Sequence, residues 1–368
     1  LLKVPGIATG PFDLKAKLDV SQQQTQLVQI EANTSFGHLT LSGTLGQGPL
    51  YTGSQLNLHL DGNDAHALMS AFNVDALPED PFSLNTSLEI VENGALIERG
   101  VLVTIKDEQL ELGGFLSFEG GSVGTDLQVS IKGKKPSRAL RHLADDKLVP
   151  DFPYDLSSRV RVLEESIRLD DFTAEYQDIK LAAGADIKLK NRSAGTQVDF
   201  QINGADLSSL KDFSWIGNSL DRFVPGQAYH ANGRLVLTGS GVQLDGVSGQ
   251  IGEAAFELSG LISSQDGMIT SNAKFSIGGP DLHGWLTDMN QSNIKPGKFK
   301  LHGDMVLTDQ LLRIRGFNFD LTQASGRIDV DIGLPLTSAS DIGFDLDIRG
   351  DDIRHFLPVN EVFEPAEV

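Results

Sequence analysis

The chain has 368 residues, and its 30 Lys and Arg against 50 Asp and Glu give a net charge of −20. This acidic balance argues against nucleic-acid binding and against adsorption to anionic headgroups through a basic surface. Cysteine is absent, which excludes disulfides, thiolate metal sites and Cys nucleophiles. No segment approaches about 18 consecutive apolar residues, so none is predicted to span a membrane. We expect the chain, which opens at Leu1 without a signal sequence, to be part of a longer protein.

A repeated pattern runs through the chain. A glycine is followed two residues later by an acidic residue and about six later by a bulky one, and these glycines are Gly62, Gly133, Gly204, Gly279 and Gly350. The second copy departs from the pattern, with Lys135 in place of the acid. Such spacing predicts stacked repeats of about 71 residues instead of two or three ordinary domains. The predicted repeats are 11–80, 81–152, 153–224, 225–295 and 296–358.

Each repeat combines strands with one short helical pattern after the glycine. The clearest helical patterns are 65–72, 137–143 and 207–213. The acidic residues Asp64, Asp206, Asp281 and Asp352 are placed to cap these helices, because a carboxylate accepts hydrogen bonds from free backbone N–H groups. A proline then often precedes the next strand, as at Pro81.

Four strands per repeat are predicted between these marks. In the second repeat they cover 82–91, 96–105, 110–118 and 125–131, and in the fifth they cover 299–307, 311–321, 326–334 and 341–349. Short turns with hairpin chemistry separate them. The sequence therefore predicts a mainly β protein of about twenty antiparallel strands with one short helix per repeat.

Apolar and polar residues alternate cleanly in many strands, so one face of the sheet is predicted to be apolar and the other wet. The predicted apolar lining residues are Leu56, Leu58, Leu60, Leu127, Val129, Ile131, Val198, Phe200, Ile202, Leu258, Ile262, Phe275, Ile328, Val330, Ile332, Phe344 and Leu346. The face either forms an ordinary core, with each repeat folded onto itself as a sandwich, or lines an elongated U-shaped groove for acyl chains. Gly114, Gly260 and Gly303 interrupt this face, where they allow bending, leave room for a ligand or form bulges.

Several stretches resemble the repeats of AsmA-like proteins, the group that includes TamB and YhdP. They are 36–45 with 56–64, 179–184 with 202–207, and 256–260 with 279–282, and the resemblance covers 11–358. The chain departs from the AsmA-like pattern at 134–136 and at the additional segment 214–222. The resemblance implies a taco-like repeating β-groove that transports phospholipid between the inner and outer membranes of a Gram-negative envelope, in outer-membrane biogenesis. It also implies a periplasmic location, an inner-membrane anchor outside this chain, and an outer-membrane or periplasmic partner protein.

Patterns that carry catalytic or metal chemistry were not found. The eight histidines lack metal-ligand spacing, and 120–124 matches G-x-S-x-G between two strands, where a nucleophile elbow does not form. The pairs Asp145-Asp146, Asp170-Asp171 and Asp351-Asp352 are interpreted as solvated turn or cap acids. We therefore predict no enzymatic activity, no cofactor and no metal site. The alternative to a lipid conduit is a structural or adhesive β-repeat protein with self-packed sandwich units.

Overall fold

The computed structural model describes residues 11–20, 26–34, 37–46, 51–66, 79–105, 107–118, 122–134, 152–190, 194–212, 223–265, 268–285, 296–308, 311–333 and 342–351. These residues form twenty strands and one short 3-10 helix, η2 (Leu207–Asp212). All the strands are assigned to one sheet, and every recorded pairing is antiparallel. The prediction of a mainly β, antiparallel fold is therefore confirmed.

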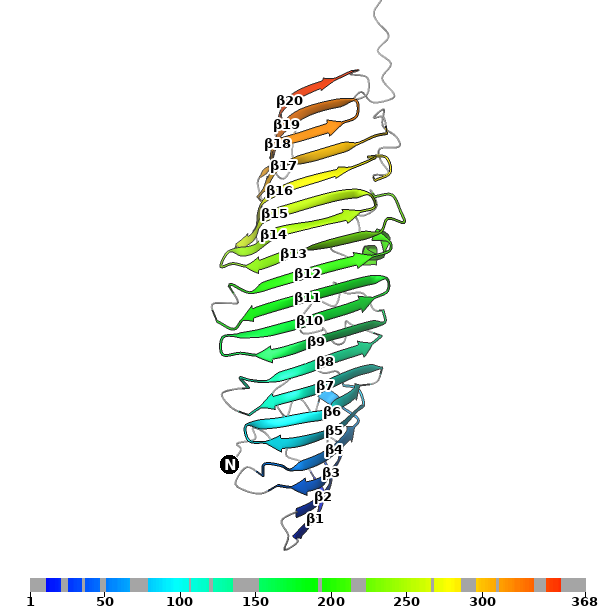
Figure 1. Ribbon diagram of the computed structural model, residues 1–368, viewed down its shortest axis with the longest axis vertical. Helices are drawn as coiled ribbons and strands as arrows, with labels where there is room; N and C mark the ends of the chain where they lie inside the picture. Colours follow the sequence, from blue (N-terminus) through cyan, green and yellow to red (C-terminus); the bar gives the residue numbers. More distant parts are fainter. Residues whose placement is uncertain are drawn as a thin grey trace, which may run out of the picture. The chain divides into compact units, whose positions relative to one another are not determined.

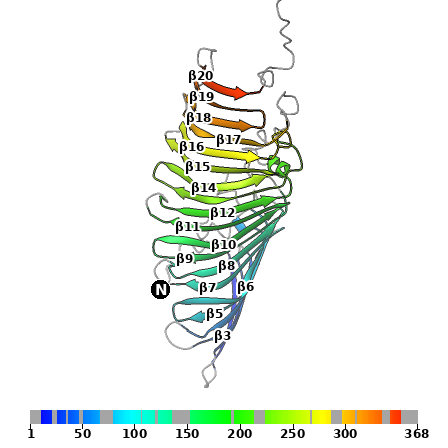
Figure 2. The same ribbon diagram turned by 45° about the horizontal axis from the view of Figure 1, so that its top comes forward.

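The chain divides into two compact units, which are described separately. The first holds β1 (Asp13–Val20), β2 (Gln26–Asn33), β3 (His38–Leu45), β4 (Gln55–Gly62), β5 (Phe82–Val91), β6 (Gly94–Ile105), β7 (Glu108–Ser117), β8 (Asp126–Gly133), β9 (Tyr154–Val162) and β10 (Ser166–Tyr176). Each of these strands pairs with the next one along the chain. Figures 1 and 2 show this succession from two directions.

The second unit is built in the same way. It holds β12 (Gln197–Gly204), β13 (Tyr229–Leu237), β14 (Gly241–Ile251), β15 (Ala254–Gln265), β16 (Met268–Gly279), β17 (Phe299–Leu307), β18 (Leu311–Leu321), β19 (Ala324–Gly333) and β20 (Ile342–Gly350). These nine strands also pair in chain order. The remaining strand, β11 (Ile179–Lys188), contributes residues to both units.

The predicted strands of the second and fifth repeats agree closely with those observed. β5, β17 and β18 have the predicted bounds, and the others begin or end a few residues away. The main difference is that β6 starts at Gly94 and β19 at Ala324, two residues before the predicted starts. A two-residue turn precedes each of these strands, so cross-strand pairing begins directly after the turn. The predicted boundaries of the five repeats stay a prediction.

A β-bulge recurs in every fourth strand, which the sequence analysis did not anticipate. β6, β10, β14 and β18 each carry one or two more residues than the facing segment of a neighbouring strand. Asp171, Gly246 and Gly316 lie in three of these bulges with φ values of 50°, 62° and 55°. Glycine adopts this left-handed conformation without steric cost, and a bulge increases the local bend and twist of its strand.

At Gly204 and Gly279 the repeated glycine has a direct packing reason. Gly62, Gly133, Gly204 and Gly279 end their strands, and each lies opposite an aromatic residue that begins the next strand: Phe82, Tyr154, Tyr229 and Phe299. A Cβ on Gly204 would lie 2.5 Å from the Tyr229 ring, and one on Gly279 would lie 2.8 Å from the Phe299 ring. We call these four cross-strand partners the Gly–aromatic pairs.

The acidic residue after the glycine caps the following turn at Asp206 and Asp281. The Oδ1 atom of Asp206 accepts hydrogen bonds from the N–H groups of Ser208 and Gly226 at 2.9 and 3.3 Å. Asp281 accepts the equivalent pair from His283 and Gly297 at 3.1 and 3.3 Å. Each carboxylate therefore ties the turn to the segment that leads into the next strand.

Helices are described only in part. The pattern at 207–213 forms η2, a 3-10 helix instead of an α-helix, and that at 65–72 is described as helical only at Ala65 and His66. The pattern at 137–143, the segment 214–222 and Asp352 lie outside the described residues. Within the part of the chain that is described, no helix has the length and apolar character needed to cross a membrane.

Two clusters of buried apolar side chains in the second unit lie beside Gly–aromatic pairs. Leu282, Trp285, Phe299 and Ala254 form one cluster, in which the Trp285 and Phe299 rings stack at 5.6 Å. Leu207 of η2 and Tyr229 form a second cluster, and Phe223 and Ile251 contact both. We call these two clusters the rim core. They cover one end of the apolar face, and the rest of this face is the candidate site.

Candidate functional site

The strand registers place apolar residues side by side across the first unit. The row that lies two residues from the Gly–aromatic pairs is called the near row. The row that lies four residues beyond it is called the far row. The near row comprises Leu14, Ala32, Leu39, Leu60, Leu84, Val103, Leu110, Ile131, Leu156 and Ala174. The far row comprises Leu18, Val28, Gly43, Leu56, Leu88, Ile97, Gly114, Leu127, Val160 and Leu169. Both rows cross ten strands without a polar residue.

The second unit repeats this arrangement. Its near row comprises Ile202, Ala231, Gly249, Phe256, Ile277, Leu301, Phe319, Gly326 and Ile348. Its far row comprises Val198, Leu235, Leu244, Gly260, Ala273, Met305, Ile314, Val330 and Phe344. In each unit, the sequence places an apolar stripe along the whole run of paired strands.

A middle row lies between the other two and is less uniform. In the second unit it includes Phe200, Leu258, Phe275, Ile328 and Leu346, and the Phe275 ring lies 6.1 Å from that of Phe317. In the first unit the polar residues Thr86 and Ser158 interrupt it beside the bulges. The bulges therefore shift the alternation locally, a detail that the sequence analysis missed.

Most of the predicted lining residues fall within these rows. Ile262 and Ile332 lie one row further from the rim core. None of the seventeen is buried: fourteen are partly exposed, while Ile262, Phe344 and Leu346 are exposed. The apolar face is thus only half-covered by its own side chains.

The opposite face carries a network of ion pairs and hydrogen bonds between neighbouring strands. Arg159 makes two hydrogen bonds to Asp126, at 2.7 and 2.6 Å, and Arg234 contacts Asp199 in the same way at 2.7 and 3.3 Å. Because side chains alternate across a strand, these polar residues and the apolar rows lie on opposite faces. The wet face is therefore ordered by cross-strand pairs.

Several pKa values reflect these contacts. The pKa of Asp126 is lowered, mainly by its hydrogen bond to Arg159, and that of Asp331 by its bonds to Arg315 and Arg313. Burial raises the pKa of Tyr229 to about 12. The pKa of Asp329 is lowered chiefly by the backbone N–H of Gly316, so this carboxylate holds the bulge of β18. These shifts follow from structural contacts and do not single out a catalytic group.

The three glycines that interrupt the apolar face lie opposite bulges. Gly114 and Gly260 face the irregular parts of β6 and β14, and Gly303 faces that of β18. A Cβ on Gly114 or Gly260 would lie 2.4 or 2.1 Å from a carbonyl oxygen of the next strand. The bulges themselves belong to the neighbouring strands, and the expectations that these glycines allow bending or leave room for a ligand stay predictions.

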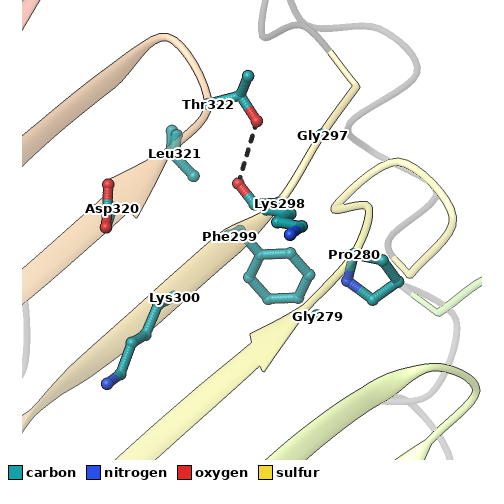
Figure 3. Close-up of a pocket in the computed structure, with 9 residues that line it drawn as sticks. All are labelled: Gly279, Pro280, Gly297, Lys298, Phe299, Lys300, Asp320, Leu321 and Thr322. Carbon is teal, nitrogen blue, oxygen red and sulfur yellow. Dashed lines mark hydrogen bonds between the residues drawn. The ribbon is translucent and has the colours of Figure 1, made fainter.

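The described hollows are lined by polar and apolar side chains together. One of about 810 Å³ is lined by Lys298, Lys300 and Asp320, with Phe299 and Pro280 at its side (Figure 3). The Thr322 hydroxyl donates a hydrogen bond to the Lys298 carbonyl oxygen at 3.3 Å at its edge. A second, of about 350 Å³, includes Leu258 and Phe275 of the middle row. These hollows include only a few residues of the apolar rows.

The residues considered for chemistry do not come together. Among the described residues, no group of three or more His, Asp and Glu side chains is arranged to hold a metal ion. Ser122 and Gly124 of the G-x-S-x-G match lie in the turn between β7 and β8, as expected. His142, His355 and the pair Asp145-Asp146 lie outside the described residues.

Comparison of the chain with protein-family models, curated proteins and solved structures found no match.

Proposed function

We propose that the apolar face binds the acyl chains of phospholipids and passes them along the sheet. The observation that carries this proposal is the continuity of the near and far rows in each unit, combined with the partial exposure of most of their side chains. A large apolar surface that a protein leaves uncovered usually marks a binding site. An acyl chain is a suitable ligand because it is long, apolar and in need of no directional contact.

Movement along such a face needs no specific pocket. Each CH₂ group removed from water contributes about 0.8 kcal/mol wherever the contact surface is apolar. Neighbouring strands lie about 4.8 Å apart, so an acyl chain leaving one strand meets an equivalent side chain on the next. The headgroup remains in water while the acyl chain slides, which keeps the barrier between neighbouring positions low.

We further propose that the strands curve around the apolar face to form a U-shaped groove. A bulge in every fourth strand supports this, because bulges bend and twist the strands that carry them. The glycines opposite three of them allow the adjacent strand to follow the bend. The finer prediction of one short helix per repeat belongs to the same proposal, in which each helix would pack at one end of the groove, as Leu207 of η2 packs beside Tyr229.

The resemblance to AsmA-like repeats extends the proposal to a location. A phospholipid conduit of that group would act in the periplasm, between the inner and outer membranes, with its anchor and its partner protein outside this chain. The proposal requires neither catalysis nor a cofactor.

The alternative, a structural or adhesive protein of self-packed sandwiches, makes a different prediction for the same residues. Facing sheets bury their inner side chains about 10 Å apart, so such a protein would have a dry core. Partial exposure of Leu58, Val129 and Phe200 favours the open face.

The test is native mass spectrometry of the purified chain, with organic extraction of whatever copurifies. Several phospholipids per chain are expected, and a folded, lipid-free chain that also rejects added lipid would overturn the proposal.

The matched variants are Leu58→Asp, Val129→Asp and Phe200→Asp on the apolar face and Asn57→Asp, Gln128→Asp and Gln201→Asp on the polar face. Circular dichroism identifies the variants that fold. Folded apolar-face variants should lose bound lipid and lipid flux between vesicles, while the polar-face variants keep both. Equal lipid binding by both sets would contradict a role for this face.

A further inference from the structure

The hollow of about 810 Å³ beside the rim core contains two lysines that the sheet does not neutralise. Lys298 lies one residue before β17 and Lys300 lies within it, and both are exposed. Among the described residues, neither ammonium group forms an ion pair. In a chain with a net charge of −20, two neighbouring cations without an acidic partner are a local exception.

The carboxylate opposite one of these lysines is also left without an ion pair. Lys132 and Asp155 face each other on β8 and β9 and form an ion pair at 3.0 Å. Lys300 and Asp320 face each other in the same way on β17 and β18, but within the described part of the chain they do not form such a pair. Asp320 also lines the hollow. The hollow therefore presents two cations and one carboxylate to a ligand.

The three charged groups are close enough together to bind one small molecule. Lys298 and Lys300 are two residues apart, which corresponds to about 6.8 Å along an extended chain. Each ammonium group has three N–H donors on a flexible four-carbon stem, so both can reach the same phosphate group. The Cα atoms of directly opposite residues such as Lys300 and Asp320 lie about 5 Å apart. Figure 3 shows these side chains around the hollow.

The charges fit a ligand that carries both signs. A simple anion would be attracted by the two lysines and repelled by Asp320, because like charges at one site disfavour each other. A phosphate group joined to an ammonium group by a short spacer satisfies all three side chains. The Thr322 hydroxyl donates to the Lys298 carbonyl oxygen at 3.3 Å, and its own lone pairs remain to accept an N–H of the ligand.

We propose that this hollow binds a phosphoethanolamine group, with its phosphate at Lys298 and Lys300 and its ammonium group at Asp320. This group occurs in the headgroup of phosphatidylethanolamine and in soluble phosphoethanolamine, and the site recognises what the two share. The inference rests on the charges of this hollow and not on the apolar rows. It can therefore hold or fail independently of acyl-chain binding.

The test is a ligand-observed NMR titration of the 368-residue chain at low salt. The probes are phosphoethanolamine, glycerophosphoethanolamine, inorganic phosphate and ethanolamine. Both esters should bind with a Kd on the order of 1 mM, because the site is open to water, and added salt should weaken the binding. Phosphate and ethanolamine should each bind at least about tenfold more weakly. No binding of either ester at about 10 mM would overturn the proposal, and so would equally tight binding of phosphate alone.

The two esters also distinguish the source of the group. Glycerophosphoethanolamine is a diester, as in a lipid headgroup, whereas phosphoethanolamine is a monoester with a second ionisation near neutral pH. Tighter binding of the diester would indicate a lipid headgroup, and tighter binding of the monoester a soluble ligand. Either result supports the site.

Removal of the two cations tests the phosphate position. Lys298→Ser/Lys300→Ser should weaken the binding of both esters by about tenfold or more, because the charge-assisted hydrogen bonds to phosphate are lost. The matched control is Lys15→Ser/Lys17→Ser, which removes two exposed lysines with the same spacing on β1 and should bind like the original chain. Circular dichroism confirms that both variants fold. Equal weakening in both would indicate an effect of net charge alone and would overturn the assignment.

Removal of the carboxylate should change the two kinds of ligand in opposite directions. Asp320→Asn should weaken the binding of phosphoethanolamine, whose ammonium group loses its partner, and strengthen that of inorganic phosphate, which is no longer repelled. Asp245→Asn, at an exposed position on β14, is the control and should change neither. If Asp320→Asn bound phosphoethanolamine as tightly as the original chain, the ammonium position would be wrong.

Discussion

The rim core and the far row of the second unit are built from similar residues but differ in how far they are covered. Phe299 in the rim core is 4% exposed, whereas seven of the nine far-row residues are partly exposed, Ala273 is buried and Phe344, on the last described strand, is 72% exposed. The rim core gains its burial from side chains outside the sheet, such as Leu282 and Trp285, which close over the Gly–aromatic pair. The same residue types therefore stabilise the fold at the rim and leave an open apolar surface beyond it.

This difference separates stability from binding along a single strand. In β16, Ile277 contacts the rim core, while Phe275, two residues earlier, belongs to the middle row. A fold that completes its core at one end of each strand can expose the remainder for a ligand. The predictions below test whether the two regions contribute to stability as their burial suggests.

The largest expected effect is the loss of a rim aromatic. Phe299→Ala removes a buried ring stacked on Trp285 and should lower the free energy of unfolding by about 3–5 kcal/mol. The matched change in the middle row, Leu258→Ala, should cost less than about 2 kcal/mol, because that side chain is already partly exposed. Urea unfolding followed by circular dichroism measures both. Equal losses would contradict the division between rim core and rows.

The next effect concerns the space that glycine leaves beneath the aromatic ring. Gly204→Ala places a methyl group against the Tyr229 ring and should cost about 1–3 kcal/mol. Gly343→Ala is the control, since nothing lies within 4 Å of its Cβ position, and it should be neutral or slightly stabilising. The double variant Gly204→Ala/Tyr229→Ala isolates the clash: its cost should be smaller than the sum of the two single costs. Additive costs would mean that the ring does not explain the glycine.

Much of the fold could be predicted from the sequence because the repeat and the alternation are carried by local pattern. The spacing of Gly62, Gly133, Gly204 and Gly279 led to four strands between successive glycines, and the bounds of β5, β17 and β18 were predicted correctly. Alternation also separated the apolar from the polar face, since a strand has a period of two. These are properties that one strand shows without its neighbours.

The bulges and the Gly–aromatic pairs could not be predicted in the same way, because they depend on register between strands. The bulges do leave a repeated pattern in the sequence, because the positive-φ residues Asp171, Gly246 and Gly316 follow one another at intervals of 75 and 70 residues. Nothing in one strand alone shows that such a residue faces an interruption in the ladder. Likewise, the ring of Tyr229 explains Gly204 only once β12 and β13 are paired. The coverage of the apolar face depends on side chains far along the chain.

A smaller effect is expected at the caps, which hold the turns that complete the rim core. Asp206→Ala removes the acceptor of two backbone N–H groups and should cost about 1 kcal/mol. Asp281→Ala should cost a similar amount, since its two bonds are equivalent. Asp345→Ala on exposed β20 is the comparison and should change unfolding little. If all three variants unfolded at the same urea concentration, the caps would not support the rim.

The smallest expected effect is a dependence of stability on pH. It arises from carboxylates both at the rim and on the polar face. Hydrogen bonds lower the pKa of Asp206 and Asp126 in the folded chain, so both carboxylates bind protons more weakly there than in the unfolded chain. Their contribution to stability is complete above the unfolded pKa of about 3.9 and is lost as the pH falls through the folded value. The urea midpoint should therefore decrease below about pH 4, and Asp206→Asn, which cannot ionise, should make that decrease shallower. An identical profile for Asp206→Asn and the original chain would show that the cap works through its hydrogen bonds without any contribution from its charge.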